Sequence, residues 1–227
     1  MPEAPSASRA EEQKKLNGLT LADPFIPLSE KEKFHLWLNR TYSPYTFTSA
    51  LLSATWDQIT GTWPSYGGGF QGFGKRFGAT LAGTEASGFF KTFFLPTVLH
   101  QDPRYFAMRT EGVLPRIVYA ASRVLVTRDD NGGNAFNYSE VLGNLFVRSL
   151  ANAYLPAQDR SFGQTMNGTA GAILSDAESN LLREFAPDIR RLFRKHAPQK
   201  VKEIEKKLPP PLQKLSPLGD DHPDDHR

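Results

Sequence analysis

The sequence predicts an all-α protein, a compact bundle of six to eight helices with disordered tails at both ends. Apolar residues recur three or four positions apart over long segments, which is the period of an amphipathic helix. No stretch keeps the alternation of apolar and polar residues that a half-buried strand requires. Serine-containing capping patterns stand where several of these segments begin, as expected at helix N-termini.

Composition limits the classes of function. The chain has 227 residues, of which 39% are apolar, so it can form a hydrophobic core. Its net charge of +3 does not favour nucleic acid as a partner. It contains no cysteine, which excludes disulfides and thiol chemistry. Residues 1–15 lack an apolar run, so no secretory signal peptide is predicted there.

Three parts are expected along the chain. Residues 1–27 are rich in proline, serine and charge and are predicted to form a flexible arm. Residues 28–196 form the helical domain, in which Ser29 begins the first helix with a capping box and Ser43–Pro44 begins the second. Residues 197–227 are expected to form a charged helix and a proline-rich tail with acidic and histidine residues.

The central helix carries a ridge of small residues four apart, which is expected to let another helix approach closely. The ridge consists of Gly74, Gly78, Ala82 and Ala86. Pro96 is expected to end or kink this helix. Between residues 77 and 99 the only charges are Glu85 and Lys91, but their cost at a membrane centre favours a buried or interfacial helix over a spanning one.

Two groups of residues are candidates for contact with a membrane or a membrane partner. The first is the aromatic end of the central helix and the second is a basic amphipathic segment that could rest on anionic lipid. They comprise Phe89, Phe90, Phe93, Phe94, Arg190, Arg191, Arg194 and Lys195. The alternatives are a tightly packed core for the phenylalanines and a solvated face for the basic residues.

The later segments predict a helix over 113–127, a polar loop after it, and a helix over 137–154. A further helix should begin with the capping box Ser175 and Glu178 and break at Pro187. One polar stripe could meet arginines of the preceding helix inside the bundle, and the alternative is a solvated face. This predicted network contains Arg116, Arg123, Glu140, Asn144, Arg148 and Asn152.

Few residues suggest catalysis or metal binding. His100, Asp102, Arg104 and Tyr105 form one cluster in which a histidine and a carboxylate could act as an acid–base pair. The alternative is a structural cluster of hydrogen bonds. Asp129, Asn131 and Glu140 fit three positions of a calcium-loop pattern that lacks its glycine. Glycine motifs near residue 70 lack the preceding strand that nucleotide binding needs, so no cofactor is predicted.

Several motifs together resemble a known group of sequences. They include GFGKRFGA, FLPTVLHQDPRYF, YAASRVLVTR, FNYSEVLGN and EFAPDIRRLF, spread over about residues 28–195. The chain resembles an uncharacterised family of exported helical proteins common in acidobacterial genomes. The resemblance implies a cell-envelope location and carries over no catalytic residue.

The leading functional hypothesis is therefore a non-enzymatic helical protein of the cell envelope, associated with a membrane surface or a membrane-bound partner. One alternative is a hydrolase that acts on lipid or envelope polymer through His100 and Asp102. Another is a soluble structural scaffold. The sequence sets no oligomeric state.

Overall fold

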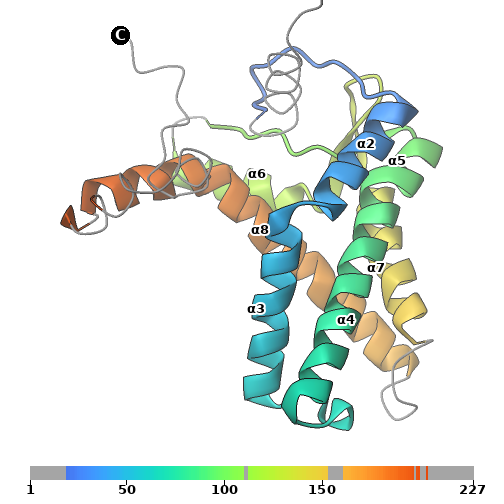
Figure 1. The fold of residues 1–227 in the computed structure, drawn as a ribbon. Helices are drawn as coiled ribbons and strands as arrows, with labels where there is room; N and C mark the ends of the chain where they lie inside the picture. The colour runs from blue at the N-terminus through green and yellow to red at the C-terminus, as the bar shows by residue number, and fades with distance from the viewer. Residues whose placement is uncertain (1–18, 110–111, 153–160, 197, 200–202, 204–227) are drawn as a thin grey trace, which may run out of the picture. The chain divides into compact units, whose positions relative to one another are not determined.

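The computed structural model describes residues 19–109, 112–152, 161–196, 198, 199 and 203. Residues 1–180 and 181–227 form two compact units, so the predicted domain boundary after residue 196 does not coincide with the division in the structure. The described residues are mainly helical (Figure 1), which confirms the predicted all-α class. A small three-stranded sheet accompanies the helices.

The first two helices begin where the capping patterns predicted. Helix α2 spans Glu30–Thr41, and the side chain and backbone of Ser29 exchange hydrogen bonds with Glu32 as a capping box. Helix α3 spans Pro44–Thr60 and is capped by the hydroxyl of Ser43. Proline suits this first helical turn because its missing N–H would have no partner inside the helix.

Helices α3 and α4 lie side by side as an antiparallel hairpin (Figure 1). Helix α4 spans Gly69–Gly88, and the short helix η1 at Pro64–Tyr66 lies in the connection. Gly61 ends α3 in the left-handed region with φ of 70°, which glycine adopts without the steric cost of a Cβ atom.

A buried arginine holds this connection together. The Arg76 side chain donates hydrogen bonds to the carbonyl oxygens of Thr62, Trp63 and Gly67 at 2.8–2.9 Å. It also donates to the side chain of Gln58 at 2.7 Å. The carbonyl of Trp63 also accepts the amide of Tyr66, so Arg76 adds a second bond there and supplies the donor for Thr62 and Gly67. One guanidinium thus fixes the loop against both helices.

The helix that begins as α4 does not end at Pro96. It continues as a π-helical segment, η2, over Phe89–Phe94 and then as α5 over Leu95–Val98. In the π register the N–H of Leu95 donates to Phe90, five residues back. Proline has no N–H to donate within an α-helix, and the wider π turn just before it accommodates this lost bond. Of the two predicted effects of Pro96, an end of the helix is therefore wrong, and the local change is the π-helical segment just before it.

An aromatic cluster joins η2 to its neighbours. Phe89 and Phe93 pack against Trp37 and Phe34 of α2, with ring centroids 5.2–6.3 Å apart. Phe90 packs edge-on against Phe146 at 5.6 Å. Each such pair adds about 0.5–1.5 kcal/mol beyond its buried area, so this cluster is a main part of the core.

The small sheet was not predicted. Strands β1, Gln101–Asp102, β2, Val126–Asp129, and β3, Asn134–Phe136, are antiparallel in that order. The segment predicted as a polar loop is thus a hairpin, and the helix predicted over 113–127 ends earlier, as α6 at Val113–Ser122. Strands of two to four residues are too short to show alternation in the sequence.

Helix α7 spans Tyr138–Ala151, within the predicted 137–154, and the side chain of Asn137 caps it by accepting the amide of Glu140. Helix α8 spans Phe162–His196 without interruption. The predictions of a new helix start at Ser175 and a break at Pro187 were wrong, because both residues lie inside α8. A proline costs one internal hydrogen bond, which the helical turns on both sides can outweigh.

Part of the predicted N-terminal arm is bonded to the domain. Leu21 donates a backbone hydrogen bond to Ala107, and Ala107 donates to Leu19. The ring of Phe25 lies 5.9 Å from that of Phe106. Residues 1–18 of the arm lie outside the described residues. So does the predicted C-terminal tail, except residues 198, 199 and 203.

Candidate functional site

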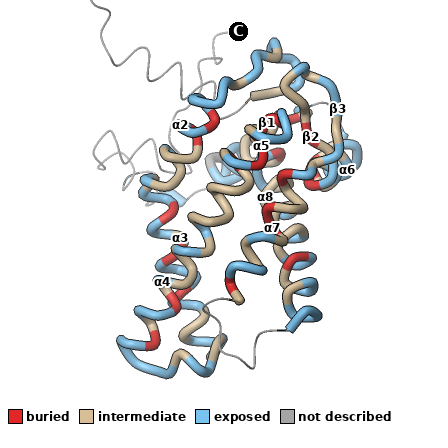
Figure 2. The backbone as a smooth tube through the Cα atoms, turned by 90° about the vertical axis from the view of Figure 1, so that its right-hand side faces the viewer, coloured by how far each residue is buried: buried red, intermediate tan, exposed pale blue. Residues whose placement is uncertain are grey.

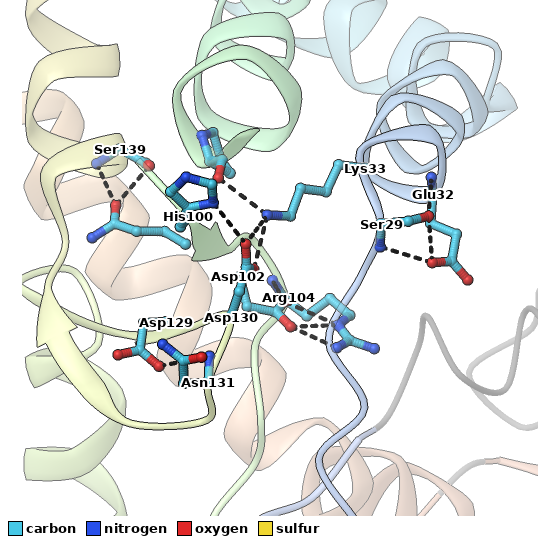
Figure 3. A network of polar contacts seen from close by, with 12 residues as sticks. Ser29, Glu32, Lys33, His100, Asp102, Arg104, Asp129, Asp130, Asn131 and Ser139 are labelled. Carbon is cyan, nitrogen blue, oxygen red and sulfur yellow. Dashed lines mark hydrogen bonds and ion pairs between the residues drawn. The ribbon is translucent and has the colours of Figure 1, made fainter. Parts of the chain in front are cut away.

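The structure separates the two residues predicted as an acid–base pair (Figure 3). The buried carboxylate of Asp102 accepts hydrogen bonds from the backbone and the guanidinium of Arg104 at 2.5–3.1 Å. His100 is exposed, and its nearest acidic partner is Asp130 at 3.7 Å. The ring of Tyr105 packs against that of Tyr119 at 6.3 Å. The arrangement therefore fits the second interpretation of this cluster, a structural one, in which the salt bridge between Asp102 and Arg104 anchors strand β1.

A buried ion pair beside it was not anticipated. Lys33 of α2 is 1% exposed and donates to both carboxylate oxygens of Asp130 at 2.8–2.9 Å and to the carbonyl of Pro96 at 3.1 Å. These bonds join α2, α5 and the β2–β3 turn (Figure 3). A buried charge requires such partners. The ion pair therefore fixes the positions of α2, α5 and the β2–β3 turn relative to one another.

Lys91 of η2 is the centre of a second polar cluster. Its ammonium lies 2.9 Å from Glu140 and 2.6 Å from Asp176 of α8. Asn144, one turn after Glu140 on α7, donates to both carboxylates at 2.8 and 3.0 Å. Glu140 and Asn144 were predicted to meet Arg116 or Arg123, and that pairing was wrong. Two acids and one lysine leave the cluster one positive charge short of neutrality.

This imbalance changes the acidity of both carboxyl groups. Burial raises the pKa of Glu140 to about 7, and its hydrogen bond with Asp176 adds to the rise. Burial also works to raise the pKa of Asp176, but hydrogen bonds from Glu140, Lys91 and Asn144 and the charge of Lys91 outweigh it and lower that pKa. The cluster therefore takes up one proton near neutral pH, on Glu140.

A groove of about 530 Å³ runs beside this cluster between α4, α7 and α8, within the unit of residues 1–180. Its walls carry small side chains and hydroxyl groups, with an aromatic pair at one end. The small residues are Ala79, Gly83, Ala151, Gly171 and Ala172, and the hydroxyl residues are Thr80, Thr84, Ser87 and Ser175. Three basic residues, Arg148, Arg76 and Lys91, and two acidic ones, Asp57 and Asp176, also line the groove.

The remaining residues of the predicted network lie apart. Arg123 contacts Asn134 at 3.2 Å and the ring of Tyr119, and burial lowers its pKa. Arg116 also has an interaction partner. Asn152 donates to Thr165 at 2.9 Å. Arg123 thus belongs to the region of the small sheet and not to the Lys91 cluster.

The calcium-loop candidates do not converge. Asp129 accepts the backbone amides of Asn131 and Gly133 and so stabilises the β2–β3 turn. Glu140 is bonded to Lys91 instead. No group of three or more acidic or histidine residues with metal-binding geometry occurs among the described residues.

The small-residue ridge of α4 is open at its first two residues. A Cβ atom added at Gly74 or Gly78 would meet no atom within 4 Å, and Ala82 is exposed. Ala86 is half-buried. Among the described residues, no atom thus lies against Gly74 or Gly78, and a helix contact along the whole ridge stays a prediction.

The predicted membrane-contact residues divide into two groups. Phe89, Phe90 and Phe93 are half-buried in the aromatic cluster, and Phe94 is exposed. Among the basic residues, which belong to the unit of residues 181–227, Arg190, Arg191 and Lys195 are exposed. The side chain of Arg194 lies outside the described residues.

Helix α3 departs from the pattern of an ordinary soluble helix. Its small residues Ala50 and Ala54 are buried at 2% and 0% exposure. Its large apolar residues are exposed, and four of them lie on one helical face because they are spaced seven, four and three apart. These four are Tyr45, Leu52, Trp56 and Ile59, which are 67–78% exposed. Buried and exposed positions accordingly alternate along α3 (Figure 2).

Two further observations bear on function. In the part of the chain that the structure describes, no helix is long and apolar enough to cross a bilayer. No protein-family model, curated protein or solved structure matches the sequence.

Proposed function

We propose that this chain is a non-enzymatic helical protein of the cell envelope that rests on a membrane surface through the outer face of α3. The envelope location is supported by the sequence resemblance, and the membrane contact by the arrangement of α3. The single observation that carries the proposal is that α3 buries its small residues and exposes its large apolar ones.

This arrangement is the reverse of a soluble amphipathic helix. Ala50 and Ala54 let α3 approach α4 closely, as small residues do where helices pack in membranes. The large apolar side chains of α3 remain in water, so the free energy of removing them from water becomes available when α3 contacts a membrane. Single exposed apolar residues are common, but a contiguous face of them marks an interaction surface.

The composition of the face favours lipid over a protein partner. Asp57 is the only charged residue in α3, and it is half-buried. Tyrosine and tryptophan at Tyr45 and Trp56 are the residues enriched where a helix lies at the membrane–water interface. Phe70, in the first turn of α4, is 91% exposed and extends the apolar surface of the hairpin.

The hydrolase alternative loses its motivating geometry. The carboxylate of Asp102 accepts hydrogen bonds from Arg104, and His100 lies beside Asp130 instead. The soluble scaffold remains as an outcome of the experiment below.

Flotation with vesicles of phosphatidylcholine and phosphatidylglycerol tests the proposal. Wild-type protein should float with the vesicles at about 0.1 M and about 1 M salt, because apolar contact is insensitive to screening. Leu52→Asn should weaken partitioning at least tenfold, since burying one leucine contributes about 1.5–3 kcal/mol. Circular dichroism checks that the variant is folded.

Leu114→Asn is the matched control, because Leu114 of α6 is exposed to the same 70% as Leu52 but lies on another helix. It should float like the wild type. Absence of flotation at either salt concentration would favour the soluble scaffold. Flotation only at the lower salt concentration, or equal losses in both variants, would also contradict an α3 contact.

A further inference from the structure

We propose that the groove between α4, α7 and α8 binds a small anion that also carries hydroxyl groups, the chemistry shared by acidic sugars and sugar phosphates. Its negative charge would lie on the guanidinium of Arg148. This inference is independent of the membrane contact, because the groove and the outer face of α3 are formed by different residues.

The groove has the size of a ligand site. Its volume of about 530 Å³ falls within the range of about 300–1,000 Å³ typical of small-molecule pockets. Glycines and alanines from all three helices, including Gly83, Ala151 and Gly171, line it, so no large aliphatic side chain fills the space. Sites between facing helices are a common place for ligands in helical bundles.

Arg148 is the cation available to a ligand. Arg76 is satisfied by loop carbonyls and Gln58, and Lys91 by its cluster. Within the described residues the guanidinium of Arg148 has no hydrogen bond or ion pair. Its side chain crosses Gly168 of α8, where an added Cβ would lie 3.2 Å from its Cδ and Nε atoms. A planar guanidinium held in this way matches a carboxylate or phosphate in bidentate geometry.

The walls specify hydroxyl groups in the ligand. Thr80, Thr84 and Ser87 line the groove from one face of α4, since they are spaced four and three apart. Ser175 lines it from α8. These four hydroxyls form no hydrogen bond with any described residue, so they are free to bond to a ligand. No leucine, isoleucine, phenylalanine or methionine lines the described groove, which argues against an acyl chain.

Isothermal titration calorimetry of the full chain tests the proposal with four probes: glucuronate, glucose 6-phosphate, glucose and inorganic phosphate. Glucuronate or glucose 6-phosphate should bind saturably, at least tenfold more tightly than glucose or phosphate alone. Which of the two binds distinguishes a carboxylate source from a phosphate source. Arg148→Gln should weaken that binding at least tenfold, while Arg183→Gln, an exposed arginine outside the groove, should not change it.

A second variant fills the groove without a clash. A Cβ atom at Gly171 meets no atom within 4 Å, so Gly171→Leu should fold and block the ligand. Binding of inorganic phosphate as tight as that of glucose 6-phosphate would indicate an adventitious ion only. That result, no saturable binding up to roughly 10 mM, or binding unaffected in both groove variants would overturn the proposal.

Discussion

The Lys91 cluster predicts that replacement of Glu140 by glutamine removes a specific pH dependence of stability. The pKa of Glu140 rises from 4.5 to about 7 on folding. Because the folded-state pKa lies above the unfolded-state one, the stability that Glu140 contributes is fully present at low pH. It is lost as the pH rises through 7. Asp176, whose pKa is lowered, behaves oppositely, but only in the acidic range below about pH 4.

The two pKa values of Glu140 fix the magnitude. Between about pH 5.5 and about pH 8.5 the free energy of unfolding should fall by about 2 kcal/mol through Glu140 alone. The amide of glutamine resembles the protonated acid but cannot ionise. Glu140→Gln should therefore match the wild type only below about pH 4.5, exceed its stability by about 1.4 kcal/mol near pH 5.5, and exceed it by about 3.4 kcal/mol near pH 8.5.

Urea denaturation of both proteins at several pH values measures this difference, and comparing them cancels the titration of other groups. Glu178→Gln is the control, because Glu178 is exposed on α8 two residues beyond Asp176. It should leave the pH dependence unchanged. Parallel curves for wild type and Glu140→Gln across this pH range would refute the account of the cluster.

Three further predictions concern the fold. Arg76→Leu should destabilise the protein by about 2–4 kcal/mol in urea denaturation, because it removes four hydrogen bonds and leaves the carbonyls of Thr62 and Gly67 without that donor; an effect below about 0.5 kcal/mol would contradict the role of Arg76. Gly74→Ala and Gly78→Ala should each stabilise it by about 0.5–1 kcal/mol, since the ridge is open, whereas destabilisation would restore the predicted helix contact. Asp102→Asn should cost about 3 kcal/mol by leaving Arg104 without its charge partner, and an unchanged thermal midpoint would argue against it.

Local signals in the sequence predicted local structure well. The capping patterns at Ser29 and Ser43 placed the starts of α2 and α3, since those bonds form within three residues of the cap. Contacts between distant segments left no such signal. Lys33 and Asp130 are 97 positions apart, and nothing near either residue indicates the other. The same holds for Lys91 and Asp176, 85 positions apart.

Some errors came from signals that have two interpretations. On α3, a small-residue stripe and a large apolar stripe lie on different faces, and the pattern alone does not say which faces inward. Close packing against α4 selected the small stripe. The role of Arg76 could have been predicted from the sequence. Its charge interrupts the apolar positions of α4, next to a loop whose carbonyls need hydrogen-bond donors. For Pro96, the π turn that accommodates it depends on packing of η2 that no local pattern encodes.

The most direct test of the central claim is the environment of position 52 in the presence of vesicles. The chain contains no cysteine, so Leu52→Cys and Leu114→Cys can each carry one nitroxide label. The account predicts that the label at position 52 becomes accessible to oxygen and protected from an aqueous relaxation agent when anionic vesicles are added, while the label at position 114 stays in water. A label at position 52 that remains as water-accessible as the one at 114 would contradict the proposal that α3 lies on a membrane.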